Sequence, residues 1–114
     1  MSVKDLKIYV KTEHLLYKIY PMLINFPKSE KFALCEHIKN NFFDALKYIS
    51  LANNVKSRRM VYAQEADGHI QVLKILIKLS KERKYISVGA FKAIDLELTE
   101  IGKMLSAYIR AIKR

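Results

Sequence analysis

Basic residues recur along this sequence at the spacing that places side chains on one face of a helix. Lys74, Lys78 and Lys81 follow one another at intervals of four and three, and residues so spaced are neighbours on a helix surface. Lys103 and Arg110 share a second helix face. Rows of ammonium and guanidinium groups suit the regularly spaced phosphates of a nucleic-acid backbone, which they bind with little regard to base sequence. These five side chains are the first candidates for a binding surface.

Two further sets of basic residues are grouped in the sequence. One runs at helical spacing through Lys4, Lys7, Lys11, His14 and Lys18. The other clusters at a turn and comprises Lys56, Arg58 and Arg59. With 21 Lys and Arg against 11 Asp and Glu, the formal net charge is +10, above the magnitude of about 2 to 8 that serves solubility in a small domain. A polyanionic partner, nucleic acid first, is favoured over a merely solvated surface.

The side chains that catalysis or metal binding would need form no recognisable pattern. The sequence lacks the Glu-x-x-His motif of di-iron bundles, a Cys-x-x-Cys pair and a Gly-rich phosphate loop. Glu65 and His69 lie one helical turn apart, but two ligands do not make a metal site, and we interpret them as a surface pair. Cys35 falls on an apolar helix face, as a small buried hydrophobe would. We therefore expect no enzymatic activity, no metal and no cofactor.

Apolar residues that recur every three or four positions predict four helices. They are expected at residues 2–24, 29–53 and 57–84 and from about residue 87 to the C-terminus. The expected core residues are Leu6, Tyr9, Leu16, Tyr20 and Leu23 in the first helix, Cys35, Ile38, Phe42, Ala45, Ile49 and Ala52 in the second, Ala63, Ala66, Ile70, Leu73 and Ile77 in the third, and Phe91, Ile94, Leu98, Ile101, Leu105, Tyr108 and Ile112 in the fourth.

Capping and helix-breaking residues agree with these four segments. Ser2 and Asp5 form a plausible capping pair for the first helix, and Ser29 and Ser87 are expected to cap the second and the fourth. Pro21 is expected to kink or end the first helix, because proline removes a backbone donor. Connections this short join antiparallel neighbours, so the predicted fold is all-α, an antiparallel up-down-up-down four-helix bundle.

The length of 114 residues suits a single domain over residues 1–114. No stretch approaches the roughly 20 apolar residues of a membrane crossing, and no secretory signal is present, so we expect a cytoplasmic protein with no membrane partner. Residues 15–24 are apolar on more than one face, which predicts association into a homo-oligomer. Gly68 and Gly102 fall inside helices and are interpreted as points of close helix–helix approach.

Several short blocks also carry a family resemblance. They are YP at 20–21, FPKSEKF at 26–32, YAQEA at 62–66, LKILIKL at 73–79, EIGKML at 100–105 and YIR at 108–110. In order and spacing the chain resembles the accessory variability determinant (Avd) proteins of diversity-generating retroelements. These belong to a wider bacterial four-helix-bundle group that includes proteins encoded within ribosomal-RNA intervening sequences. The resemblance spans about residues 15–112.

The resemblance implies a non-enzymatic accessory protein, assembled as a ring-like homopentamer with a basic surface. Such a protein binds the element's reverse transcriptase and its RNA during mutagenic cDNA synthesis, with RNA or DNA as partner. On this chain it makes Lys74, Lys78, Lys103 and Arg110 the preferred contacts. Lys28 and Lys31 also fall in a matching block, although they are equally suited to charging the entrance of the second helix.

Three other functions stay open. The chain is also compatible with a structural bundle of the ribosomal intervening-sequence type, or with an interaction module for an acidic protein. A peripheral membrane module would need one helix with a basic face and an exposed apolar face.

Overall fold

The four segments with helical apolar spacing form α-helices in a computed structural model that describes residues 2–3 and 6–113. The elements in chain order are α1 (Lys7–Ile19), the short 3-10 helices η2 (Tyr20–Asn25) and η3 (Lys28–Glu30), α2 (Leu34–Asn54), the 3-10 helix η4 (Lys56–Arg58), α3 (Arg59–Glu82) and α4 (Val88–Lys113). The described residues contain no strand. The predicted all-α class is therefore confirmed.

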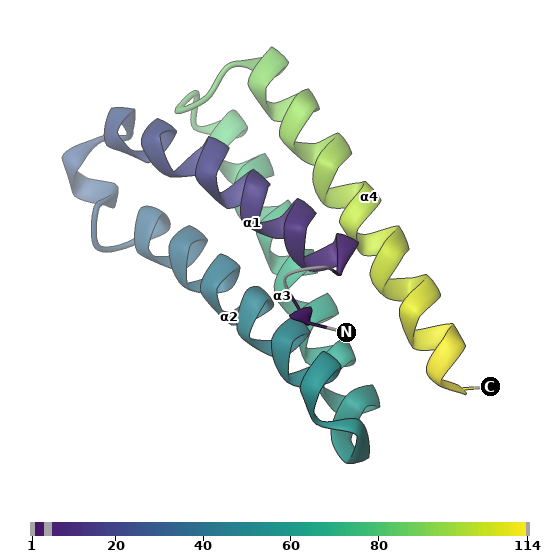
Figure 1. Ribbon diagram of the computed structural model, residues 1–114. Helices are drawn as coiled ribbons and strands as arrows, with labels where there is room; N and C mark the ends of the chain where they lie inside the picture. Colours follow the sequence, from purple (N-terminus) through teal and green to yellow (C-terminus); the bar gives the residue numbers. More distant parts are fainter. Residues whose placement is uncertain (1, 4–5, 114) are drawn as a thin grey trace.

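The helices alternate in direction, so each lies antiparallel to the one before it (Figure 1). The most extensive pairing joins α2 to α3, followed by α3 with α4. α1 has 13 residues and α4 has 26, so α1 covers one end of the bundle only, and the C-terminal half of α4 extends past it (Figure 1). The bundle measures 44 × 24 × 20 Å along its principal axes.

The seams predicted for the last three helices lie against the core. Every seam residue of α2 and α3 is buried, and in α4 Ile94, Leu98, Ile101 and Leu105 are buried while Phe91, Tyr108 and Ile112 are half-buried. Phe42 is the largest side chain with no exposed surface. The three-four spacing therefore fixes which side of each of these helices faces inward.

The seam predicted for the first helix is partly wrong. The buried residues of α1 are Ile8, Thr12, Leu15, Leu16 and Ile19, whereas Tyr20 is 47% exposed. A polar residue belongs to this seam because the Thr12 hydroxyl donates to the Ile8 carbonyl at 2.8 Å, so it enters the core with its hydrogen bond made. The predicted seam breaks at Glu13, and the change to 3-10 geometry after Ile19 turns Tyr20 outward.

Two of the expected helix ends are confirmed. α1 ends at Ile19 and continues as η2, with Pro21 in the first turn of the 3-10 helix, as the missing proline N–H requires. Ser87 caps α4, because its Oγ accepts the Ala90 N–H at 3.0 Å. α3 ends where Lys84 takes a positive φ of 63°, and the Tyr85 N–H then donates back to the Ser80 carbonyl at 2.9 Å.

Of the other expected caps, Ser29 differs from the structure, and the pair of Ser2 and Asp5 lies partly outside the described residues. Ser29 lies within η3, and α2 begins only at Leu34, so Ser29 does not cap that helix. The 3-10 turn that follows Pro27 takes up the residues predicted for the first turn of α2. α1 begins at Lys7 without a side-chain cap from its N-cap residue, and Asp5 lies outside the described residues.

The packed position of Phe42 gives a stability prediction. Phe42→Ala should lower the free energy of unfolding by about 3–5 kcal/mol, because it leaves a cavity where the ring packs. Urea unfolding followed by circular dichroism measures the change. Phe32→Ala is the matched control, since that ring is 82% exposed and its loss should cost less than about 0.5 kcal/mol. Equal losses for the two variants would contradict the core placement.

Candidate nucleic-acid interface

A groove runs between α3 and α4 and brings together the five basic residues that are the first candidates for a binding surface. It consists of two cavities of about 510 and 540 Å³ that share Gln71 and Lys74 in their walls. The groove's cations are Lys74, Lys78, Lys81, Lys103 and Arg110. They meet there because the buried seams of α3 and α4 turn both basic rows toward the same side of the helix pair.

Lys74 lies at the junction of the two cavities and is held in place by α4. Its Nζ donates to Thr99 Oγ1 at 2.7 Å and lies 3.7 Å from Asp95 Oδ1. The side chain is 31% exposed, and an ammonium group has three donors. Lys74 therefore presents an oriented positive charge at the centre of the groove.

The remaining cations of the groove are less restrained. Lys81 Nζ lies 4.5 Å above the Phe91 ring and 3.2 Å from Glu82 Oε1. Lys78, Lys103 and Arg110 are exposed, and within the described residues none of them has a carboxylate at ion-pair distance. Because no carboxylate among residues 2–3 and 6–113 neutralises these three charges, they are available to an external anion.

Sequence analysis missed the uncharged polar residues of the groove. Gln71, Thr99 and Ser106 line it beside the cations, and each can hydrogen-bond to a phosphate or a ribose hydroxyl. A signal for them was present, because Thr99, Lys103, Ser106 and Arg110 recur at three-four spacing. A pattern of charged residues alone does not include the polar side chains between them.

The prediction that the two helix glycines mark close helix–helix packing is wrong. A Cβ added at Gly68 would meet nothing within 4 Å, and one at Gly102 would meet only Gln71 Nε2 at 3.8 Å, an ordinary contact distance. Gly102 instead lines the groove, and Gly68 is exposed on α3. The absence of a side chain therefore opens surface at both positions.

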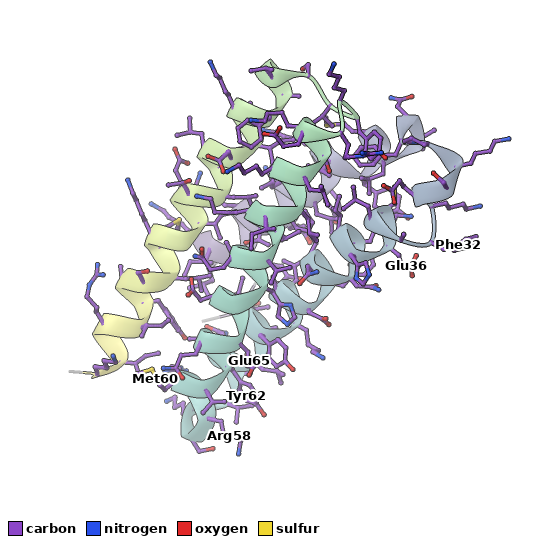
Figure 2. All side chains as sticks on the ribbon, turned by 180° about the vertical axis from the view of Figure 1, so that it is seen from behind. Phe32, Glu36, Arg58, Met60, Tyr62 and Glu65 are labelled. Atoms are coloured by element: carbon purple, nitrogen blue, oxygen red, sulfur yellow. The ribbon has the colours of Figure 1, made fainter. Side chains whose placement is uncertain are left out.

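Two arginines of the basic cluster at the α2–α3 turn, Arg58 and Arg59, have different surroundings. Arg59 donates from Nε to the Ala52 carbonyl at 2.7 Å and from Nη2 to the Asn53 carbonyl at 2.8 Å, so it closes the C-terminal end of α2. Two of its five N–H donors are thus used within the fold, and the role of Arg59 as a nucleic-acid contact stays a prediction. Arg58 is exposed and lies 5.6 Å from the Tyr62 ring centroid at the same turn (Figure 2).

Two lysines of the basic row on the first helix pair with carboxylates of α4. Lys11 Nζ lies 3.0 Å from Glu100 Oε2, and Lys18 Nζ lies 3.2 Å from Glu97 Oε1, so both ammonium groups join α1 to α4. Lys4 lies outside the described residues. Two of the row's four described members therefore have carboxylate partners on α4, and the other two, Lys7 and His14, are exposed.

Lys28 and Lys31 lie apart from the groove, at the opposite end of the bundle from the C-terminus of α4 (Figure 1). Both line an apolar cavity beside η3. The structure thus separates these two lysines from the other candidates and gives them different surroundings.

The described residues include no group of three or more His, Cys, Asp and Glu that could hold a metal ion.

The sequence predicts a surface pair of Glu65 and His69, but in the structure the His69 ring has other neighbours. Its Nδ1 lies 2.8 Å from Asn41 Oδ1, and its ring stacks on Tyr48. Cys35 is buried, as predicted, and burial raises the pKa of its thiol.

Over the described ranges, no helix has both the length and the apolar character of a bilayer crossing.

The different surroundings of two adjacent arginines give a second prediction. Arg59→Ala should lower the free energy of unfolding by about 1–3 kcal/mol, because two carbonyls at the end of α2 lose a charged donor. Arg58→Ala, the matched control, removes an exposed side chain and should change it by less than about 0.5 kcal/mol. Chemical denaturation of both variants measures the difference. An Arg59→Ala protein as stable as the control would show that the carbonyl contacts contribute nothing.

Comparison with known proteins places the chain in a family. A search among curated proteins gives no match. The family model described as bAvd-like matches residues 6–112, which include all four helices apart from the last residue of α4. The same range contains the blocks on which the resemblance to Avd proteins rests. This protein therefore belongs to the bAvd-like family.

Proposed function

We propose that this protein is a non-enzymatic accessory factor of a retroelement and that its α3–α4 groove binds the phosphate backbone of RNA or DNA alongside the element's reverse transcriptase. The observation that carries the proposal is the meeting of five cations from two helices in one groove, where two carboxylates of the described residues, Asp95 and Glu82, lie within ion-pair distance of them. Family membership supports the retroelement role and the reverse transcriptase as protein partner.

Binding depends on how the charges are spaced along rigid helices. Lys74 to Lys81 and Lys103 to Arg110 each cover seven residues, or roughly 10.5 Å of helix. About three phosphates of one strand occupy that length. Five contacts would release enough counterions to give a log–log salt slope of roughly −3 to −4 for a single strand and about −4.5 for a duplex. Affinity would thus be largely independent of base sequence.

Self-association would multiply these contacts. The outward side of α3 carries Val61, Glu65, Gly68, Val72, Ile75 and Leu79 at three-four spacing, and we call these residues the α3 stripe. Its four large apolar side chains are 42–66% exposed. We propose that a neighbouring copy covers the α3 stripe in a ring-like oligomer, five-membered by resemblance. Repeated grooves would then bind one nucleic acid with the avidity of linked sites.

The nucleic-acid proposal makes a quantitative prediction. Lys78→Glu/Lys103→Glu should weaken binding to a structured RNA hairpin by at least about tenfold at moderate salt and reduce the magnitude of the salt slope by about two, because each phosphate contact contributes close to one. Filter binding over a KCl series measures both quantities.

The matched control is Lys7→Glu/Lys56→Glu, which changes the net charge equally on exposed side chains outside the groove. It should retain most of the affinity and the full slope. Failure of the unmodified protein to bind at low salt would refute the proposal, as would equal losses in the two double variants.

The oligomer proposal is tested at Val72 and Leu79, two residues of the α3 stripe that do not line the groove, unlike Ile75. Val72→Glu/Leu79→Glu should reduce the molar mass measured by light scattering to that of one chain, because charged side chains in a closed apolar contact lack partners. Val88→Glu/Leu96→Glu is the control, since both residues are exposed and apolar but lie on α4. A monomeric unmodified protein would contradict self-association.

A further inference from the structure

A second binding surface lies beside η2 and η3, on other elements than the α3–α4 groove. It is a cavity of about 260 Å³ where the two 3-10 helices meet the first turns of α2. Leu23, Ile24 and Phe26 form its apolar wall. The cavity exists because Pro21 ends α1 and α2 begins late, which leaves two turns of 3-10 backbone where continuous helices would have packed.

Three ammonium groups stand around this apolar cavity. Lys28, Lys31 and Lys39 line it, and in the described ranges none of them has a carboxylate at ion-pair distance. Lys39 Nζ lies 4.9 Å from the Tyr20 ring centroid, and Lys31 Nζ lies 5.3 Å from that of Phe32. A cation over a ring face keeps its hydrogen-bond donors available. An apolar cavity with such a rim is complementary to an apolar group that carries negative charge beside it.

The apolar surface continues beyond the cavity. Ile24 and Phe32 are each 82% exposed, and Phe32 lies at the edge of the molecule (Figure 2). A second apolar cavity of about 350 Å³, lined by Tyr17 and Phe43 among others, shares Tyr20 with the first. Two adjoining depressions joined by exposed apolar side chains suit a ligand that extends over the surface, such as a peptide segment, better than a compact small molecule.

We propose that this surface, defined by Tyr20, Ile24, Phe32, Lys28, Lys31 and Lys39 and called the η2–η3 site, binds an acidic segment of a partner protein that inserts a bulky apolar side chain. Carboxylates of the segment pair with the three lysines while the apolar side chain fills the cavity. The assignment is independent of the nucleic-acid proposal, because it uses other residues and a different ligand.

Charge decides between this occupant and the alternatives. A second copy of the chain carries +10, so like charge opposes its approach to a rim of three lysines. A nucleic acid has the right charge, but a base inserted between Leu23, Ile24 and Phe26 would leave its polar edge without partners. An acidic peptide with an apolar anchor satisfies both parts of the site.

The test uses a fluorescein-labelled probe peptide, Asp-Glu-Phe-Glu-Glu-Leu-Asp-Glu, followed by anisotropy. It should bind, and replacing its Phe and Leu with Ser should weaken binding at least about fivefold, because the cavity no longer receives an apolar side chain. Lys28→Glu/Lys31→Glu should weaken it at least about tenfold, and Lys56→Glu/Lys113→Glu, exposed cations at the other end of the bundle, should retain most of the affinity. Methyl resonances of Leu23 and Ile24 should shift on binding, whereas those of Val61 should not.

Three results would overturn the proposal. Equal binding of the Ser peptide would show charge attraction without use of the cavity. Equal losses in the two double-lysine variants would show binding to net charge rather than to the site. Ile24→Ser/Phe32→Ser changes two exposed side chains, and if it dissociated the oligomer, the surface would be a contact between copies. Unchanged oligomerisation and RNA affinity in that variant, with lost peptide binding, would support the assignment and leave the groove proposal standing by itself.

Discussion

Burial of one apolar seam per helix determines the position of every other side chain in this bundle. In α3 and α4 that seam is continuous, so each helix has one rotational setting about its axis. Once the seams face inward, Lys74, Lys78 and Lys103 turn toward a common groove, and Ile75 and Leu79 turn outward. The groove and the α3 stripe are consequences of packing, which is why a core substitution would displace both.

The same constraint explains which buried faces and helix starts can be predicted from the sequence. The seam residues predicted for α2 and α3 are all buried, but each helix buries one further residue that the pattern left out, Leu34 in α2 and Ser80 in α3. Ser80 is polar, and its hydroxyl donates to the Leu76 carbonyl of the same helix at 2.8 Å. In α1 the true seam contains Thr12, whose hydroxyl bonds to its own helix, and a pattern of apolar residues alone selects a neighbouring line instead. The start of α2 was misplaced for a related reason: Ser29 has the chemistry of a cap, but the backbone after Pro27 makes a 3-10 turn first.

The spacing of basic residues along the sequence does not show which groups their side chains contact. A lysine at helical spacing looks the same whether its ammonium group faces solvent or a carboxylate of another helix. Lys11 and Lys18 meet Glu100 and Glu97 across 89 and 79 residues of sequence, and Arg59 meets carbonyls at the end of the preceding helix. Such partners depend on the arrangement of helices, which local periodicity does not contain. The part of the candidate site on α3 and α4 was predictable from the sequence. Its two rows of basic residues lie beside the buried seams of these helices, and the seams decide which way the rows face.

Sorting the cations by their partners leaves two positive surfaces with different chemistry. In the α3–α4 groove the neighbours of the cations are Gln71, Thr99 and Ser106, which are hydrogen-bonding groups that match a phosphate and sugar backbone. At the η2–η3 site the neighbours are Leu23, Ile24 and Phe26, which match an apolar side chain and leave a base edge without partners. A single polyanion would make poor use of the second surface, and an acidic peptide would make poor use of the first. Because the two surfaces lie on different elements, the two ligands that we propose would not compete for the same residues, as is required of a factor that brings a protein to a nucleic acid.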